Sequence, residues 1–219
     1  MDQALTPRPR GLAKYRLEAL IDGIFAVALT LLVLDIRLPE NLVVTTNADL
    51  LDRLFTLERH FVIYVISFIV IGMYWVSHHI QFYFVARTNR GLIWINLLFL
   101  LLISFLPFAT DLIGDHETLV VPCEIYGATL LALSCMSFLH VEYLARHPGL
   151  ASPEFTPVII ELLRRRIALF AFVPIVSMSV AFFSTRAAVY VYMLMGAAHF
   201  LPGHIDERID VPAQATDVA

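Results

Sequence analysis

Six long apolar stretches follow one another along the chain, at about residues 17–38, 61–85, 92–112, 119–143, 167–184 and 187–204. Each approaches the roughly 20 residues that an α-helix needs to cross the hydrocarbon core of a bilayer. The last two are short and only residues 184–186 separate them, which predicts a tight helical hairpin. The pattern therefore predicts an all-α membrane protein with six transmembrane helices per chain.

Two amphipathic segments lie between these stretches. Residues 49–60 predict a short helix on the outer surface before the second span. Residues 152–166 predict an interfacial helix that runs into the fifth span, with Ser152 as N-cap and Pro153 at the first helical position. This segment ends in three consecutive arginines, which suit the anionic head groups of a membrane surface.

The composition supports a membrane protein. Hydrophobic residues make up 59% of the chain and charged residues 16%, and the mean hydropathy is +0.76. A soluble domain carries about 25% charged residues, so the composition argues against a water-soluble enzyme. No repeat and no composition shift divides the sequence, so we expect one six-span domain over residues 1–219, with tails at 1–14 and 205–219.

The basic residues predict the orientation, because cytoplasmic loops collect Lys and Arg. Eleven of the fifteen fall on the side of the N-terminus, and the remaining four, Arg37, Arg53, Arg59 and Arg186, fall on the other side. We therefore expect both termini in the cytoplasm. The two cysteines, Cys123 and Cys135, are about 18 Å apart along one predicted helix and cannot form a disulfide within it.

The first span carries acidic residues where lipid is expected. At 100° per residue, Glu18 and Asp22 share one face, and Gly23, Val27, Thr30 and Leu34 form a separate stripe about a quarter-turn away. One interpretation is a tightly packed helix whose Asp22 pairs with a donor on another span, and Arg16 is a possible partner. The other is that the stripe lines a pore while Asp22 fixes the rotation of the helix.

The second span holds two adjacent histidines, His78 and His79, which point about 100° apart. That geometry is poor for a zinc site, so a membrane metalloenzyme is a weak alternative. A hydrogen-bonded network between helices is more economical, because lipid offers no partners. We expect His78 or His79, Asn96 and Asp22 to satisfy one another in such a network.

Three stretches together resemble the short prokaryotic form of the transmembrane protein 175 family of potassium-permeable channels. The family signature at the first span is Arg-x-x-x-Phe-Ser-Asp, and the chain has Arg16 and Asp22 at that spacing but Leu20 and Ile21 in place of Phe and Ser. The second-span "YWVSHH", with Trp75, and the third-span "NLLFLLLISFLPF", with Pro107, also resemble family motifs. The resemblance extends from residue 12 to about 205.

The resemblance implies a homotetramer in which the first helices line a central pore on a four-fold axis. By position, Val27 matches the constricting residue of the family, Thr30 a pore hydroxyl and Leu34 the next ring, with Gly23 on the same stripe. The signature residues would organise a network between the first three spans; they are Arg16, Asp22, Trp75, His78, His79 and Asn96. The missing serine predicts a sparser network, and Val27, which is smaller than Ile or Leu, predicts a wider constriction.

The resemblance thus implies a passive potassium channel in a prokaryotic plasma (inner) membrane, and the chain is not expected to be an enzyme. Potassium is expected as the permeating ion, and no cofactor or metal site is expected. The expected partners are further copies of the chain, membrane lipids and monovalent cations, without nucleic acid. The alternative is a secondary transporter or proton pathway that uses Asp22 and His79 as relay groups.

Overall fold

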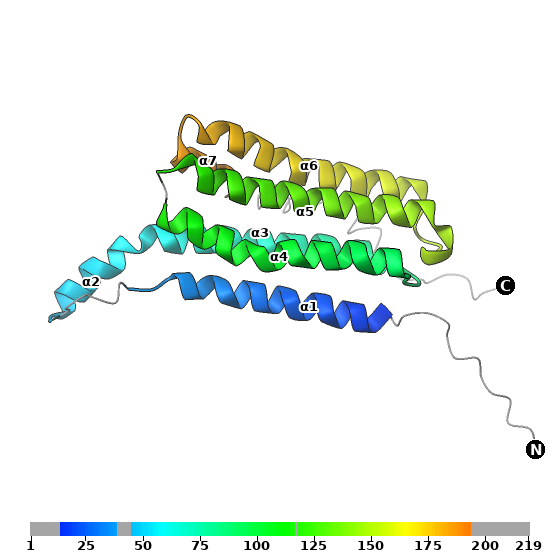
Figure 1. The fold of residues 1–219 in the computed structure, drawn as a ribbon, viewed down its shortest axis with the longest axis horizontal. Helices are drawn as coiled ribbons and strands as arrows, with labels where there is room; N and C mark the ends of the chain where they lie inside the picture. Colours follow the sequence, from blue (N-terminus) through cyan, green and yellow to red (C-terminus); the bar gives the residue numbers. More distant parts are fainter. Residues whose placement is uncertain (1–13, 39–44, 117, 194–219) are drawn as a thin grey trace, which may run out of the picture.

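The computed structural model describes residues 14–38, 45–116 and 118–193, and this part of the chain is helical with no strand (Figure 1). Its elements in order are α1 (Lys14–Leu31), the 3-10 helix η1 (Leu32–Asp35), α2 (Asn47–Thr56), α3 (Glu58–Tyr83), α4 (Arg90–Asp115), α5 (Val120–Arg146), the 3-10 helix η2 (Pro148–Leu150), α6 (Pro157–Ala181) and α7 (Thr185–Val191). The prediction of an all-α membrane protein is confirmed for these residues.

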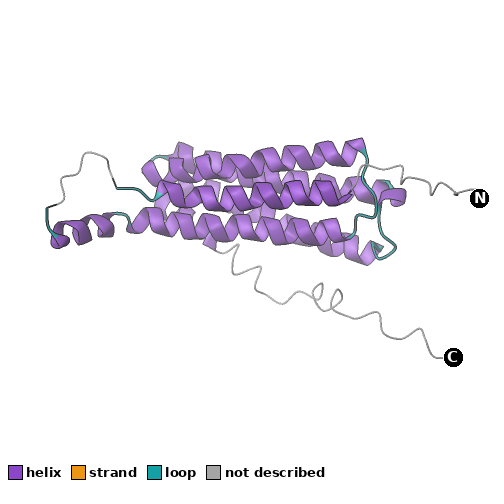
Figure 2. Cartoon of the chain, turned by 90° about the horizontal axis from the view of Figure 1, so that it is seen from below, coloured by secondary structure: helices purple, strands orange, loops and turns teal. Residues whose placement is uncertain are grey.

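The long helices lie side by side in one elongated bundle, and their connections gather at its two ends (Figure 2). Helix α1 packs against α3 and α4, α4 packs against α5, and α5 packs against α6. Helix α1 therefore lies at one margin of the bundle, while α5, α6 and α7 form the opposite side (Figure 1). The short α2 projects beyond one end, and none of its residues is buried.

Four of the described helices are long and apolar enough to cross a membrane, and they correspond to the first four predicted spans. They are Lys14–Asp35, Glu58–Tyr83, Arg90–Asp115 and Val120–Arg146. Helix α6 covers the fifth predicted span and α7 the start of the sixth, as a hairpin; residues 194–204 of that span and nearly all of both tails lie outside the described residues. The number of six spans stays a prediction.

The predicted start of the 152–166 helix is wrong. Ser152 donates its backbone N–H to the carbonyl of Phe84 at 2.8 Å, and Ala151 forms an isolated antiparallel bridge with Val85. These contacts hold residues 151–152 in an extended conformation, so the helix begins later. Thr156 is the N-cap and Pro157 the first helical residue of α6, which then continues to Ala181, near the end of the fifth predicted span.

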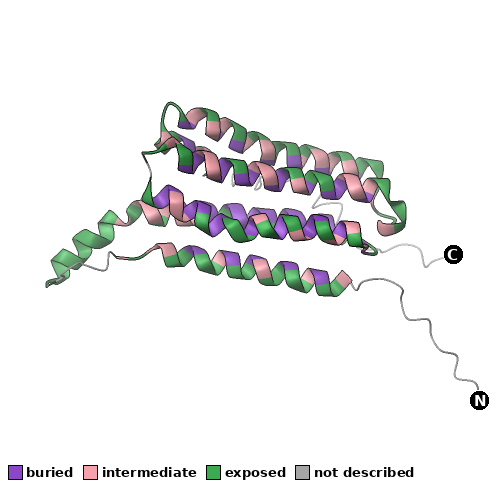
Figure 3. Ribbon diagram, viewed as in Figure 1, coloured by how far each residue is buried: buried purple, intermediate pink, exposed green. Residues whose placement is uncertain are grey.

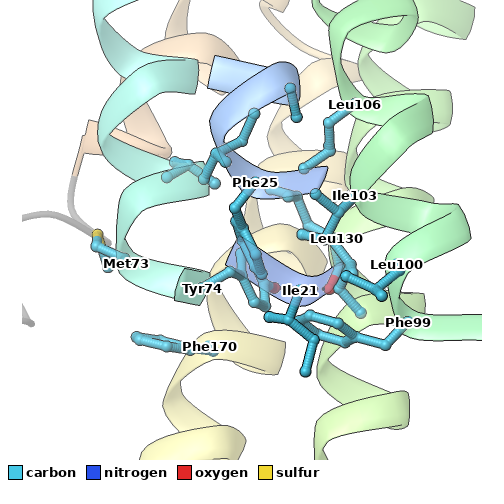
Figure 4. Close-up of a cluster of buried hydrophobic side chains, with 14 of the residues drawn as sticks. Ile21, Phe25, Met73, Tyr74, Phe99, Leu100, Ile103, Leu106, Leu130 and Phe170 are labelled. Carbon is cyan, nitrogen blue, oxygen red and sulfur yellow. Dashed lines mark hydrogen bonds between the residues drawn. The ribbon is translucent and has the colours of Figure 1, made fainter. Parts of the chain in front are cut away.

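The core of the bundle is a set of large side chains from all the long helices (Figure 4). Tyr74 of α3 lies at its centre, with its ring centroid 6.4 Å from that of Phe99 and 5.7 Å from that of Phe170. Its hydroxyl donates to the carbonyl of Leu130 at 2.8 Å, so this buried polar group is satisfied. This core anchors α3, α4, α5 and α6, and α1 reaches it through Phe25.

Candidate pore helix and its polar network

Helix α1 buries one face and leaves the other open. Its buried positions recur every three or four residues and are Leu17, Ile21, Phe25, Ala28 and, in η1, Leu32. This spacing is the period of an amphipathic α-helix, although almost every residue here is apolar. Most of the other positions are exposed along the length of the helix, while Ile24 and Leu29 are half-buried beside the core (Figure 3).

The four residues of the predicted pore stripe lie on the open face. Val27 and Leu34 are 56% and 63% exposed, Thr30 is exposed, and a Cβ added at Gly23 would meet no atom within 4 Å. The hydroxyl of Thr30 donates to backbone carbonyls of its own helix, those of Ala26 at 3.0 Å and Val27 at 2.9 Å. Its hydrogen is therefore directed to the backbone, and the free lone pair of the oxygen is an acceptor.

Two further residues share this face and were not included in the predicted stripe. Leu20 and Leu31 are 44% and 41% exposed. At 100° per residue they lie only 20° to 40° beyond Val27, so a wider angular window would have found them from the sequence. We call the set Leu20, Gly23, Val27, Thr30, Leu31 and Leu34 the open face of α1.

The carboxylate of Asp22 is held by an indole rather than by the expected cation or imidazole. The Nε1–H of Trp75 in α3 donates to Asp22 Oδ1 at 2.9 Å. The Trp75 ring stacks on His79 one turn later, with centroids 5.6 Å apart. Arg16 is exposed and forms no ion pair with Asp22 in the described part of the chain.

A second hydrogen bond of the predicted network joins α3 to α4. His78 and Asn96 are both buried, and His78 Nε2 lies 2.7 Å from Asn96 Oδ1. Because the amide oxygen can only accept, Nε2 carries the hydrogen; Asn96 Nδ2 then donates to the carbonyl of Leu92. The sequence predicted a single network of Asn96 and Asp22 with His78 or His79. In the structure His78 pairs with Asn96, whereas Asp22 belongs to a separate pair with Trp75.

His140 of α5 completes this buried group, and its position was not predicted. Its ring lies edge-on to that of His78, with centroids 5.7 Å apart. Phe99 covers the other side of the imidazole of His78 at 4.9 Å. The sequence offered only a histidine near the end of a span, which does not reveal the neighbour across the bundle.

A cavity of about 280 Å³ lies beside these pairs, and Glu18, Asp22, His78 and His79 are among its lining residues. Lys14 forms an ion pair of 3.5 Å with Glu18 across this end of α1. Ile21, at the position of the signature serine, lines the cavity too and is otherwise packed into the core. Apolar packing thus occupies the place where the family pattern has a hydroxyl.

No group of three or more His, Cys, Asp or Glu side chains is arranged to hold a metal ion in the described residues. Cys123 and Cys135, which lie on α5, are both free thiols. The site on α1 and α3 is therefore a set of hydrogen-bonded pairs beside an open helix face.

Comparisons with known proteins agree with the resemblance seen in the sequence. The sequence profile of the family described as endosomal/lysosomal potassium channel TMEM175 matches residues 16–107. A potassium channel of Chamaesiphon minutus is 38% identical over 122 residues, 54% of this chain and 60% of that protein, so the match spans less than two thirds of its length. A potassium channel of a Chryseobacterium species is 28% identical over 199 residues, 91% of this chain and 97% of the relative.

A crystal structure supports the same assignment for the fold. The potassium-selective TMEM175 homologue from Chamaesiphon minutus superposes with a TM-score of 0.73 at 27% sequence identity. The superposition covers 86% of this chain and 96% of the homologue. These similar proteins are channels rather than enzymes, and the chain resembles the TMEM175 family in its sequence over residues 16–107 and in its helical fold.

Proposed function

We propose that the protein is a passive, potassium-permeable cation channel, in which four copies of the chain place α1 around a central pore. The observation that carries this proposal is the open face of α1, which has the length of a membrane span and has no cover in the single chain. The similar proteins from Chamaesiphon minutus and Chryseobacterium, both named potassium channels, support the choice of ion.

Small residues beside the open face suit contact with another copy. A groove of about 400 Å³ runs along α1 and reaches Ser104 of α4; Ala19, Gly23 and Ala28 are among its lining residues. Small side chains let transmembrane helices approach closely, which is the main source of their attraction within lipid. We infer that a neighbouring copy packs along this groove, with the rest of the face directed to the axis.

In this arrangement, apolar and polar rings of side chains alternate along the pore. Val27 and Leu34 supply apolar rings, and conduction requires water to enter this neck. Thr30 supplies a ring of hydroxyl oxygens whose hydrogens are directed to Ala26 and Val27 carbonyls, so the oxygens present lone pairs. Such a ring favours cations over anions, because it offers acceptors to the passing ion.

Potassium flux from liposomes tests the proposal. Purified protein is reconstituted into potassium-loaded vesicles, and efflux is followed after addition of a proton carrier, with the mass of the detergent-solubilised complex measured in parallel. We expect efflux that does not saturate with the potassium gradient, and the mass of a tetramer. Absence of potassium flux from a verified tetramer would contradict the proposal.

A transporter or proton pathway is the second candidate, because Asp22 and His79 line the same cavity at one end of α1. It predicts saturable transport that Asp22→Asn abolishes, without single-channel current steps. The channel predicts current steps, and predicts that Asp22→Asn alters their frequency through the loss of charge opposite Trp75.

We further propose that the chain lies in a prokaryotic plasma membrane with both termini in the cytoplasm. In a background of Cys123→Ala and Cys135→Ala, intact cells carrying Arg53→Cys should react with a membrane-impermeant maleimide. The same cells carrying Arg87→Cys should not react until they are lysed. Arg53 and Arg87 are both exposed and lie at opposite ends of the bundle, so the reverse labelling would invert the orientation.

A further inference from the structure

Three arginines lie at the end of the bundle where α3 ends, α4 begins and α5 ends (Figure 1). Arg87 is in the loop between α3 and α4, Arg90 is the first residue of α4, and Arg146 is the last residue of α5. All three side chains are exposed. They belong neither to the open face of α1 nor to the hydrogen-bonded pairs of Asp22 and His78.

Tyr143 of α5 joins the start of α4 to the end of α5. Its hydroxyl accepts a hydrogen bond of 3.0 Å from the side-chain amide of Asn89, the N-cap of α4. A Cβ added at Gly91 would collide with the same hydroxyl, so the first turn of α4 packs directly on the last turn of α5. The backbone N–H of Arg87 donates to the carbonyl of Leu150 at 3.1 Å, which holds the loop against the segment after α5. The three arginines therefore lie in one region of the surface.

The positive charge of this region favours an anionic partner. Among the described residues, the side chains of Arg87 and Arg90 form no hydrogen bond and no ion pair. Arg146 lies 3.9 Å from Glu142 Oε2, but Arg164 of α6 donates to the other oxygen of that carboxylate at 2.7 Å. An anionic head group would supply the counter-charge that Arg87 and Arg90 lack within the described chain.

The surface next to these arginines, further along α4, is aromatic and then aliphatic. Trp94 follows Arg90 by one helical turn and is 65% exposed. Leu98 and Leu101 are also exposed, and at 100° per residue all four side chains lie within 80° of one another. A phospholipid presents its phosphate, its glycerol region and its acyl chains in the same order, and tryptophan prefers the interfacial region of a bilayer. A small inorganic anion would gain nothing from the apolar part of this surface.

We propose that this surface binds an anionic phospholipid, with its phosphate at Arg87 and Arg90, its glycerol region at Trp94 and an acyl chain along Leu98 and Leu101. The inference requires only that the chain spans a membrane, and it does not depend on potassium conduction. The bound lipid would hold the loop after α3 and the first turns of α4 at the membrane surface. A second copy of the chain is the competing occupant of this face.

Tryptophan fluorescence tests the site, because Trp94 is one of two tryptophans in the chain. The full chain carrying Trp75→Phe retains Trp94 alone and is reconstituted into mixed vesicles of phosphatidylglycerol and phosphatidylcholine. In each mixture one of the two lipids has brominated acyl chains, which quench an indole that they contact. We expect phosphatidylglycerol to be favoured at Trp94 by about fivefold or more, because each arginine near the surface contributes about fivefold to the binding of an anionic lipid.

The double variant Arg87→Gln with Arg90→Gln should lose this preference, and each single variant should lose part of it. Arg165→Gln is the matched control, because Arg165 is 74% exposed at the same end of the bundle but pairs with Glu161 on α6. It should retain the preference. Equal quenching by the two lipids, an unchanged preference in the double variant, or an equal loss in Arg165→Gln would overturn the proposal.

Two further outcomes separate the lipid from other occupants. Absence of quenching by either lipid would assign this face of α4 to another copy of the chain, and loss of the preference in millimolar inorganic phosphate would assign the arginines to a free anion. Either result would overturn the proposal. If Trp75→Phe fails to fold, native mass spectrometry of the unsubstituted chain replaces the fluorescence measurement. It should show phosphatidylglycerol retained over phosphatidylcholine, and equal retention of the two lipids would contradict the site.

Discussion

At the scale of single residues, Asp22 shows how a carboxylate is accommodated on an apolar helix, near one end of the bundle. Its oxygen accepts from Trp75 Nε1 at 2.9 Å, and this bond joins α1 to α3. A hydrogen bond to a charged group contributes about 1.5–3 kcal/mol, less where solvent reaches it. Trp75 is 38% exposed, so the lower end of that range applies.

Replacing Trp75 tests this bond. Trp75→Phe keeps an aromatic ring but removes the donor, and we expect a decrease in stability of about 1–2 kcal/mol. Thermal unfolding in detergent measures it, as a double-mutant cycle with Asp22→Asn. A coupling energy below about 0.5 kcal/mol would show that the two side chains act independently.

The prediction for conduction concerns Val27. Val27→Asn replaces the apolar ring with amides, which should lower the barrier to wetting of the neck. A decrease of only about 1.4 kcal/mol in this barrier raises the rate of ion passage about tenfold. Vesicle efflux or single-channel current measures that rate.

Val121→Asn is the control for Val27. Val121 is exposed at the start of α5, which packs on α4, α6 and α7. An equal rise in flux for both variants would assign the effect to a general disturbance of the bundle rather than to a constriction at Val27.

At the scale of helices, Gly127 of α5 lies directly against the side chains of Met178 in α6 and Tyr192. A Cβ added there would lie 2.5 Å from Met178 Cγ and 2.9 Å from the hydroxyl oxygen of Tyr192. Gly127→Ala should therefore destabilise the protein by about 1–3 kcal/mol, because the side chains of Met178 and Tyr192 must shift to admit the methyl group.

Gly72 of α3 provides the matched comparison, since nothing lies within 4 Å of a Cβ added at that position. Gly72→Ala should be neutral or stabilising by up to about 1 kcal/mol, because alanine lowers the conformational entropy of the unfolded chain. The two unfolding temperatures are compared directly. An unfolding temperature for Gly127→Ala at or above that of Gly72→Ala would contradict the close packing.

At the scale of the whole molecule, the single chain leaves α1 at the margin of its bundle with an uncovered face. Gly23→Leu should be tolerated by the isolated chain, because the space around Gly23 is open. In the proposed tetramer the added side chain enters either the pore or the contact with a neighbour. We expect an unchanged unfolding temperature of the subunit together with a potassium flux reduced about tenfold or more, equivalent to about 1.4 kcal/mol of added barrier.

Gly72→Leu serves as the control for this assembly effect, since Gly72 also has open space but lies on α3. Its flux should equal that of the wild type. A wild-type flux and a wild-type complex mass for Gly23→Leu would mean that lipid, not another copy, covers the open face of α1.

The sequence by itself determined the first four membrane helices and the stripe on α1. Lipid offers no hydrogen-bond partners, so a long apolar run must form a helix, and the 100° step then fixes which side chains share a face. It also suggested that Asn96 bonds to one of the two adjacent histidines, His78 or His79.

Only the tertiary structure decided which neighbour each polar group meets. Asp22 pairs with Trp75 rather than with Arg16, and His140 lies against His78, because the packing of α1, α3 and α5 sets those distances. The start of α6 moved from Ser152 to Thr156 for the same reason: a contact with the distant Phe84 outweighed a local capping signal. Local periodicity fixes the direction of a side chain, whereas its partner is fixed by residues far away in the sequence.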